Sequence, residues 1–210
     1  MVKILIADDH AIVRRGLTQI IKDSPGMEVT AEAGTGLEAL DLIAKHDFDI
    51  LVLDISMPGR SGLDVLKDIK RLKPSLPVLI LSIHPEEQYA VRVFKSGASG
   101  YMTKDSAPEE LLKALEKIVQ GGKYVTPSLA EKMAVSLDKD IQKPAHELLS
   151  DREYQVLYRI AKGETVKEIA EDLFLSAKTV STYRARILEK MNLKNNAELI
   201  HYAFSHHLID

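Results

Sequence analysis

Val2-Lys3-Ile4-Leu5-Ile6-Ala7-Asp8-Asp9 is an apolar run that ends in two carboxylates. Three later runs end in the same abrupt way, close to one chemically reactive side chain each. They are Ile50-Leu51-Val52-Leu53 before Asp54, Pro77-Val78-Leu79-Ile80-Leu81 before Ser82, and Ser99-Gly100-Tyr101-Met102 shortly before Lys104. If these runs are neighbouring parallel strands, their carboxyl ends meet at one edge of a sheet. The pattern therefore predicts one site that contains carboxylates, a hydroxyl and an ammonium group.

Segments with a helical repeat of apolar residues separate these runs. They are Ala11 to Lys22, Leu37 to Lys45, Leu63 to Leu72, Glu86 to Lys95 and Pro108 to Val119. Five strands that alternate with five helices indicate an α/β fold with a doubly wound, five-stranded parallel sheet. This pattern ends near Gly121-Gly122.

Composition narrows the class of protein. The 210 residues are 45% apolar and 28% charged, which suits one large domain or two modest ones. No apolar stretch approaches the ~20 residues that cross a bilayer, and the first residues already show a strand pattern rather than a leader. The chain has no cysteine, so thiolate chemistry and disulfides are excluded. We expect a cytoplasmic protein with no membrane partner.

Carboxylates that share a site repel one another unless a cation neutralises them. Mg²⁺ accepts one or two protein carboxylates and keeps other positions for water, a carbonyl and a phosphoryl oxygen. We predict Asp9 and Asp54 as ligands, Asp8 as a ligand through water and the Ser56 backbone carbonyl as a further one. Asp54 would be the nucleophile in a phosphoryl transfer that Lys104 stabilises. Taken singly, each of these residues is also explained as a helix cap, a turn former or a surface charge.

Residues 1 to about 121 resemble the receiver domain of bacterial two-component response regulators. The resemblance rests on Ile6-Ala7-Asp8-Asp9-His10, on Leu53-Asp54-Ile55-Ser56-Met57-Pro58-Gly59 and on Tyr101-Met102-Thr103-Lys104-Asp105. It implies a flavodoxin-like fold and phosphoryl transfer from a sensor histidine kinase to Asp54. It also implies that Ser82 and Tyr101 are the switch residues, and that Ser56 and His84 tune the hydrolysis of the acyl phosphate.

Residues 122–148 are less apolar and read as an interdomain linker. Thr126-Pro127-Ser128 could cap a short helix that continues to about Val135.

Residues 149–210 have no strand pattern and predict a small all-α domain of four helices. Ser150 and Glu153 form a capping box for a helix that runs to Lys162, Thr165 begins a second, and Asn196 caps the fourth. Ser176 caps the third helix, Ala177 to about Met191, behind a tight turn at Phe174-Leu175. Two helices joined in this way form a helix-turn-helix. The residues predicted to face the core of the last two helices are Val180, Ile187, Leu188, Met191, Leu199, Ile200, Ala203 and Phe204.

The charge of this tail is balanced overall, with nine Lys/Arg and nine Asp/Glu, but it is unevenly distributed. Between Ser176 and Asn195 five basic residues stand against Glu189 alone. The third helix therefore fits a major groove, with some side chains toward bases and others toward phosphates. The predicted DNA contacts are Ser176, Lys178, Thr179, Val180, Ser181, Thr182, Arg186 and Lys190. A solvated basic helix in a protein-interaction bundle remains the alternative.

The tail resembles the LuxR-type DNA-binding domain, and nearly the whole chain resembles a NarL/FixJ-type response regulator. The shared residues are Leu149-Ser150-Asp151-Arg152-Glu153, Lys167-Glu168-Ile169-Ala170, Leu175-Ser176, Lys178-Thr179-Val180 and Glu189-Lys190-Met191. Many members have lysine and histidine where this chain has Ser181 and Tyr183. The resemblance implies a transcriptional regulator rather than an enzyme, with promoter DNA as a partner and RNA polymerase as a further candidate. It also implies a homodimer when phosphorylated or on DNA, paired through Leu199, Tyr202 and His206.

The residues alone also allow two other functions. An aspartyl-phosphate hydrolase would also use Asp54 and Mg²⁺, but such enzymes usually carry a second carboxylate two residues later, where this chain has Ser56. A receiver-controlled protein-interaction module would use the tail to bind a protein and would not retain a specific duplex.

Overall fold

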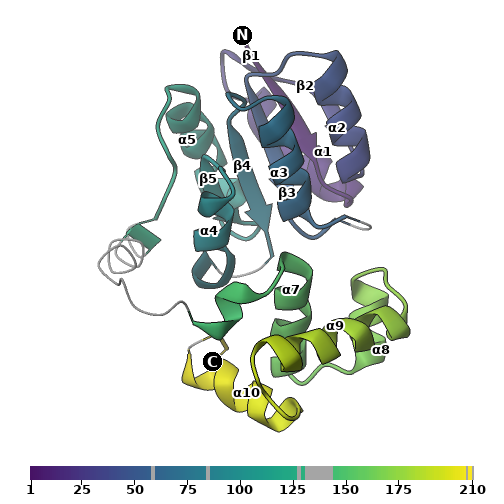
Figure 1. Cartoon of the computed structure of the whole chain (residues 1–210). Coiled ribbons are helices and arrows are strands. Elements are labelled where there is room, and N and C mark those ends of the chain that lie inside the picture. The colour runs from purple at the N-terminus through teal and green to yellow at the C-terminus, as the bar shows by residue number, and fades with distance from the viewer. Residues whose placement is uncertain (58–59, 84–85, 127–128, 131–143, 207, 210) are drawn as a thin grey trace. The chain divides into compact units, whose positions relative to one another are not determined.

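The computed structural model describes residues 1–57, 60–83, 86–126, 129–130, 144–206 and 208–209 (Figure 1). The chain divides into two compact units, Met1–Asp138 and Lys139–Asp210. Among the described residues, no helix combines the length and apolar character that a membrane span requires.

The first unit contains a five-stranded parallel sheet, which confirms the predicted fold class. The strands are β1 (Val2–Ala7), β2 (Met27–Ala33), β3 (Ile50–Asp54), β4 (Val78–Ser82) and β5 (Gly100–Thr103), in the spatial order β2-β1-β3-β4-β5. Every neighbouring pair is parallel. The order reverses between β1 and β3, which is where ligands of such sheets bind.

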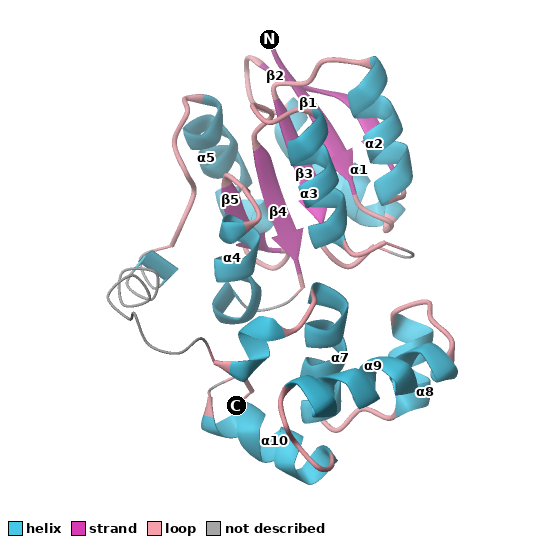
Figure 2. Ribbon diagram, viewed as in Figure 1, coloured by secondary structure: helices cyan, strands magenta, loops and turns pink. Residues whose placement is uncertain are grey.

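Helices cover both faces of this sheet (Figure 2). They are α1 (Ala11–Lys22), α2 (Gly36–Lys45), α3 (Gly62–Leu72), α4 (Glu86–Lys95) and α5 (Ala107–Val119). Right-handed crossovers put α1 and α5 on one face and α2, α3 and α4 on the other. Leu17 and Ile21 of α1 share a core cluster with Leu111 and Leu115 of α5.

The burial of each strand explains whether it can be recognised as an apolar run in the sequence. All five residues of β3 and of β4 are buried, so these strands read as continuous apolar runs. The edge strand β2 alternates between exposed and partly buried residues, including Glu28 and Glu32, and therefore shows no such run. Asp54 and Ser82 are the last residues of β3 and β4 rather than the first residues after them, so each strand extends one residue further than predicted.

Gly62 allows the loop after β3 to fold back tightly. A Cβ atom there would lie 2.4 Å from Ile55 Cα and 2.8 Å from the Asp54 carbonyl oxygen. We expect Gly62→Ala to lower the free energy of unfolding of the first unit by about 2–3 kcal/mol, because backbone atoms must move. Gly16→Ala is the matched control, since a Cβ in α1 would meet nothing within 4 Å, and it should stabilise by about 0.5–1 kcal/mol. Urea denaturation of both variants tests the pair, and equal effects would contradict the close approach.

The second unit is helical. It contains a short 3₁₀ helix, η1 (Ala145–Leu148), followed by α7 (Asp151–Ala161), α8 (Val166–Asp172), α9 (Ala177–Lys190) and α10 (Asn196–Ser205). The predicted capping box of Ser150 and Glu153 is present, and Thr165 and Ser176 cap α8 and α9. The predicted cap of the last helix was wrong by one residue, because the Asn195 side chain accepts the hydrogen bond from the Glu198 backbone N–H.

Two assignments on α10 were also wrong. Ile200 and Phe204, expected in the core, are exposed, and the Phe204 side chain is 64% accessible. Leu199 and Ala203 are completely buried, as predicted for the core, so Leu199 is not available on the outer side for the pairing that the resemblance implied. The buried stripe is narrower than predicted, because Leu199 and Ala203 lie on it whereas Ile200 and Phe204 each lie one residue further around the helix.

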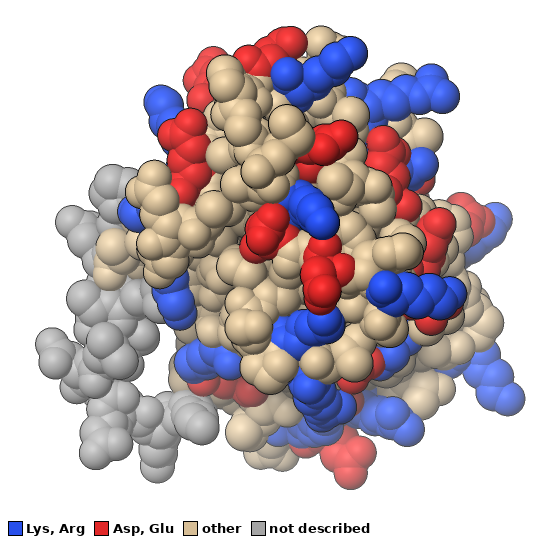
Figure 3. All heavy atoms as spheres, turned by 90° about the horizontal axis from the view of Figure 1, so that it is seen from above, with Lys and Arg blue, Asp and Glu red and all other residues tan. Residues whose placement is uncertain are grey.

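The first residues of the predicted linker pack on the first unit. Tyr124 forms a parallel bridge with Gly100 of β5, and its backbone N–H donates to the Ser99 carbonyl at 2.9 Å. The helix expected to continue to about Val135 lies mostly outside the described residues, as does His84. On the face shown in Figure 3, acidic and basic side chains are interspersed, so this face has no field of a single sign.

Candidate phosphoryl-acceptor site and nucleic-acid interface

Two buried carboxylates meet one ammonium group at the carboxyl edge of the sheet. Asp8 follows β1 and Asp54 ends β3, and each is only 1% exposed. Lys104, directly after β5, places its Nζ 2.8 Å from Asp54 Oδ2 and 2.7 Å from Asp8 Oδ2. The Ser56 backbone N–H donates to Asp54 Oδ1 at 2.9 Å. The structure therefore brings together Asp8, the neighbouring pair Asp54 and Ser56, and Lys104, which come from three distant stretches of the sequence.

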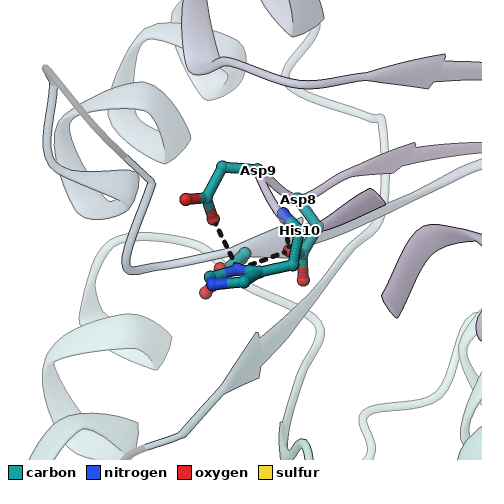
Figure 4. Close-up of side chains that lie close together, drawn as sticks. Asp8, Asp9 and His10 are labelled. Atoms are coloured by element: carbon teal, nitrogen blue, oxygen red, sulfur yellow. Dashed lines mark hydrogen bonds and ion pairs between the residues drawn. The ribbon is translucent and has the colours of Figure 1, made fainter. Parts of the chain in front are cut away.

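Asp9 and His10 complete the acidic cluster. Figure 4 shows the His10 imidazole between the two aspartates, with Nδ1 2.9 Å from Asp9 Oδ1 and 3.3 Å from Asp8 Oδ1. One ligand atom from each of Asp8, Asp9, His10 and Asp54 falls within 4.8 Å of all the others. His10 was not among the site residues predicted from the sequence, although its place directly after the two carboxylates was a signal for such a role.

Burial and charge oppose each other in this site. Burial raises the pKa of the Asp54 carboxyl above its usual range, and the Lys104 ammonium only partly offsets this. Burial alone would lower the pKa of Lys104, but the neighbouring carboxylates of Asp54 and Asp8 outweigh it, so that the pKa is raised overall. Lys104 is therefore charged and holds the two carboxylates together.

The donor set fits a divalent cation. When ionised, Asp8, Asp9 and Asp54 carry three negative charges against one positive charge on Lys104. Oxygen-rich clusters with an excess of negative charge suit a hard cation such as Mg²⁺. The acidic cluster predicted from the sequence is thus present, and the ion that it would hold belongs to the proposal below.

Arg14 of α1 anchors the backbone of the acidic cluster. Its guanidinium donates to the Asp8 carbonyl oxygen at 2.7 Å and to Glu32 of β2 at 3.0 Å. Thr18 also donates to Glu32, at 3.3 Å. This network joins α1 and the edge strand to the loop that carries Asp8 and Asp9.

The two predicted switch residues are both buried. Ser82 ends β4 and Tyr101 lies in the middle of β5, and neither side chain is exposed to solvent. The Lys104 backbone N–H donates to the Ser82 carbonyl at 2.7 Å, which connects the two strand ends beside the acidic cluster.

The helix α9 carries the predicted nucleic-acid contacts, and most of them are accessible. Ser176, Lys178, Ser181, Thr182 and Arg186 are exposed, and Thr179 is partly exposed. A shallow hollow of about 320 Å³ lies on this side of the helix. It is lined by Tyr183 and by five of the predicted contacts, which are Ser176, Lys178, Thr179, Thr182 and Arg186.

Two of the predicted contacts need correction. Val180 is completely buried in the core of the second unit, so its side chain cannot reach a groove. Lys190 is half-exposed, but its Nζ is held 2.7 Å from Glu153 of α7, which is itself buried. Lys190 continues the spacing of the exposed set, one turn after Arg186, and only its packing against α7 separates it from that set, whereas Val180 shares the helical spacing of the buried Ile187.

The Glu153–Lys190 pair supports a prediction about acid stability. Burial raises the pKa of Glu153, but Lys190 and the Ser150 backbone N–H outweigh this and lower it overall. Because the folded pKa is below the unfolded one, the stabilisation is present above about pH 4.3 and disappears as the pH falls through the folded pKa. We expect Glu153→Gln to cost about 1–2 kcal/mol at pH 7 and progressively less below pH 4. Hydrogen exchange of the α7 amides in the full chain measures this, with exposed Glu171→Gln as the control, and a pH-independent difference would contradict it.

Comparison with known families assigns both units. Residues 4–116 match the response regulator receiver domain, and residues 147–203 match the bacterial regulatory proteins of the luxR family. The chain belongs to the response regulators. It is one with a LuxR-type DNA-binding domain after the receiver, of the NarL/FixJ type, as the sequence predicted.

Relatives match this chain over nearly their whole length. The response regulator UvrY of Escherichia coli K12 is 35% identical over 209 residues, which cover 99% of this chain and 96% of UvrY. The oxygen regulatory protein NreC of Staphylococcus epidermidis is 41% identical over 216 residues, covering 99% of each protein. RcsB of Salmonella enterica serovar Typhimurium, solved on the promoter rprA with the phosphomimetic BeF₃⁻, superposes with a TM-score of 0.66 at 29% identity, covering 96% of this chain and 97% of RcsB.

Proposed function

We propose that this response regulator accepts a phosphoryl group on Asp54 from a sensor histidine kinase and, in response, binds promoter DNA through α9. The observation that carries the proposal is the buried Asp54 carboxylate, paired with Lys104 beside Asp8 and Asp9. The chain acts as a switch and not as an enzyme with turnover. Binding to promoter DNA requires that it work in the cytoplasm.

The acceptor chemistry follows from the site. An Asp54 oxygen attacks the phosphorus of a phosphohistidine, the P–N bond breaks as the new P–O bond forms, and the histidine leaves with its bonding pair. Lys104 is positioned to stabilise the negative charge on the phosphoryl oxygens. Asp9 and Asp54, Asp8 through water and the Ser56 carbonyl would hold Mg²⁺. Mg²⁺, when bound, supplies the second neutralising charge.

Regulation would pass from Asp54 through Ser82 and Tyr101 to the face formed by α4, β5 and α5. Dimerisation of that face, or release of the second unit, would then raise DNA affinity. Of the residues predicted for pairing two copies on DNA, Tyr202 and His206 stack on each other with ring centroids 3.9 Å apart and line a surface hollow of α10, so they remain in the proposal, whereas the buried Leu199 does not. Solved RcsB dimers on DNA support this arrangement by similarity. RNA polymerase is a further candidate partner.

For the division of the chain we propose a receiver at 1–121, a linker at 122–148 and a DNA-binding domain at 149–210. The separation of the two compact units between Asp138 and Lys139 supports this division, because it falls inside the proposed linker.

The Arg14 network supports a prediction about the acceptor site. We expect Arg14→Met to weaken Mg²⁺ binding by about tenfold and to slow phosphorylation, because the Asp8 backbone loses its anchor. Arg15→Met is the matched control, since Arg15 is the exposed neighbour on the same helix. Calorimetric titration with Mg²⁺ measures the effect, and rescue by Arg14→Lys would separate positioning from a loss of fold.

Selection of genomic DNA fragments with and without acetyl phosphate tests the proposed function as a whole. Enrichment of particular fragments that increases with acetyl phosphate is the expected result. Retention of a protein partner without any enriched duplex would favour the interaction module, and turnover of a phosphomonoester would favour the hydrolase.

A further inference from the structure

We propose that α9 recognises two guanines about three to four base pairs apart, one through Lys178 and one through Arg186, with thymine methyl groups preferred between them. This inference rests on the proposed function, because it names the DNA sequence that the same helix would read.

Two of the four basic side chains of α9 are already paired within the second unit. The Arg184 guanidinium donates to Asn196 of α10 at 2.6 Å, and the Lys190 ammonium is paired with Glu153 at 2.7 Å. Lys178 and Arg186 are exposed, and within the described part of the chain neither charged group has a polar partner. Only these two of the four basic side chains on α9 are therefore free to reach base edges.

The hydroxyl groups around them are mostly satisfied within the helix. Thr182 donates to the Lys178 carbonyl at 2.9 Å, so its methyl group is the part that remains for a partner. Ser176 and Thr179 bond to each other at 2.8 Å, and Ser176 also accepts the Thr179 backbone N–H. Ser181 is exposed and takes no part in the helix cap, and Ala185 adds a second exposed methyl group.

The residue types restrict what this face can read. Adenine is read by Asn or Gln and the cytosine amino group by Asp or Glu, whereas guanine is read by Arg or Lys and the thymine methyl by Ala or Thr. The segment from Ala177 to Arg186 contains none of Asn, Gln, Asp and Glu. The two free cations therefore match guanine and the Thr182 and Ala185 methyl groups match thymine, whereas the Ser181 hydroxyl can bond either kind of base edge and adds no preference.

Helix geometry sets the separation of the two guanines. Lys178 and Arg186 are eight residues apart, which is about 12 Å along a helix that rises 1.5 Å per residue. Successive base pairs are about 3.4 Å apart, so the two cations span three to four of them. Both residues line the same hollow of α9, so they face the same groove.

Charge also orients the helix. Its first turn has no acidic residue, and its amino end adds the positive end of the helix dipole. Glu189 is exposed one turn beyond Arg186, where it would repel phosphates. The amino-terminal half of α9 therefore enters the groove, and Arg186 marks the end of the reading segment.

The test is selection of duplexes from a random library by the full chain with acetyl phosphate and Mg²⁺, followed by anisotropy titrations of single base-pair exchanges. We expect two enriched guanines at the stated separation in each half-site, and a tenfold to hundredfold loss of affinity when either G·C pair is replaced by A·T. Lys178→Met should remove the preference at one guanine only, and Arg186→Met at the other.

Lys194→Met is the control for the loss of one positive charge, because Lys194 is exposed in the turn after α9. It should leave both base preferences unchanged. Enriched duplexes without the guanine pair, or preferences that survive both Met variants, would overturn this inference while the proposed function stands. The absence of any enriched duplex would instead count against the proposed function and this inference together.

Discussion

Asp54→Asn is expected to abolish incorporation of labelled phosphate from acetyl phosphate. The amide cannot act as the nucleophile. Among the described carboxylates, only Asp8 is equally buried and also paired with Lys104, and it would keep its place beside the Lys104 ammonium group. The expected loss is complete within detection rather than partial, because the bond-forming oxygen itself is removed. In the natural protein, lability of the label to alkali and to hydroxylamine identifies the product as an acyl phosphate.

Asp41→Asn is the matched control, since Asp41 is an exposed aspartate of α2 in the same unit. It should incorporate label like the natural protein. The Asp54 variant should remain folded, because it removes one of several crowded negative charges. Incorporation of label into a folded Asp54→Asn protein would contradict the assignment of Asp54 as the phosphoryl acceptor.

Lys104→Met is expected to have the second largest effect, and on two quantities. Formation of the acyl phosphate should slow by about a hundredfold, because the charge that stabilises the phosphoryl oxygens is lost. The first unit should also lose about 3 kcal/mol in the absence of Mg²⁺, because Asp8 and Asp54 would be left buried without their shared cation. Mg²⁺ should restore more stability to this variant than it adds to the natural protein.

Thermal unfolding with and without Mg²⁺, together with phosphorylation rates, measures both effects. Lys113→Met is the control, because Lys113 is exposed on α5. A Lys104 variant with an unchanged response to Mg²⁺ would show that the ammonium does not share the site with the cation.

The local pattern of the sequence was sufficient for much of this protein. Continuous apolar runs predicted β1, β3, β4 and β5, and the helical repeats predicted the helices between them, because a strand or helix buried on a sheet needs those spacings. The capping residues Ser150, Thr165 and Ser176 marked three helix starts, since each satisfies backbone N–H groups within its own turn. The convergence of Asp8, Asp54 and Lys104 followed from the parallel order of the strands.

Tertiary structure decided the features that depend on packing between elements. Lys190 has the sequence spacing of the exposed DNA contacts, but its ammonium group is paired with Glu153 of α7. Val180 was predicted both for the core and for DNA contact, and packing places it in the core. The orientation of α10, the role of His10 beside Asp9 and the anchoring of Asp8 by Arg14 were likewise decided by neighbours far along the chain. Hydrophobic periodicity and capping act within a few residues and can be read from the chain, whereas burial and ion pairing depend on which surfaces meet after it has folded.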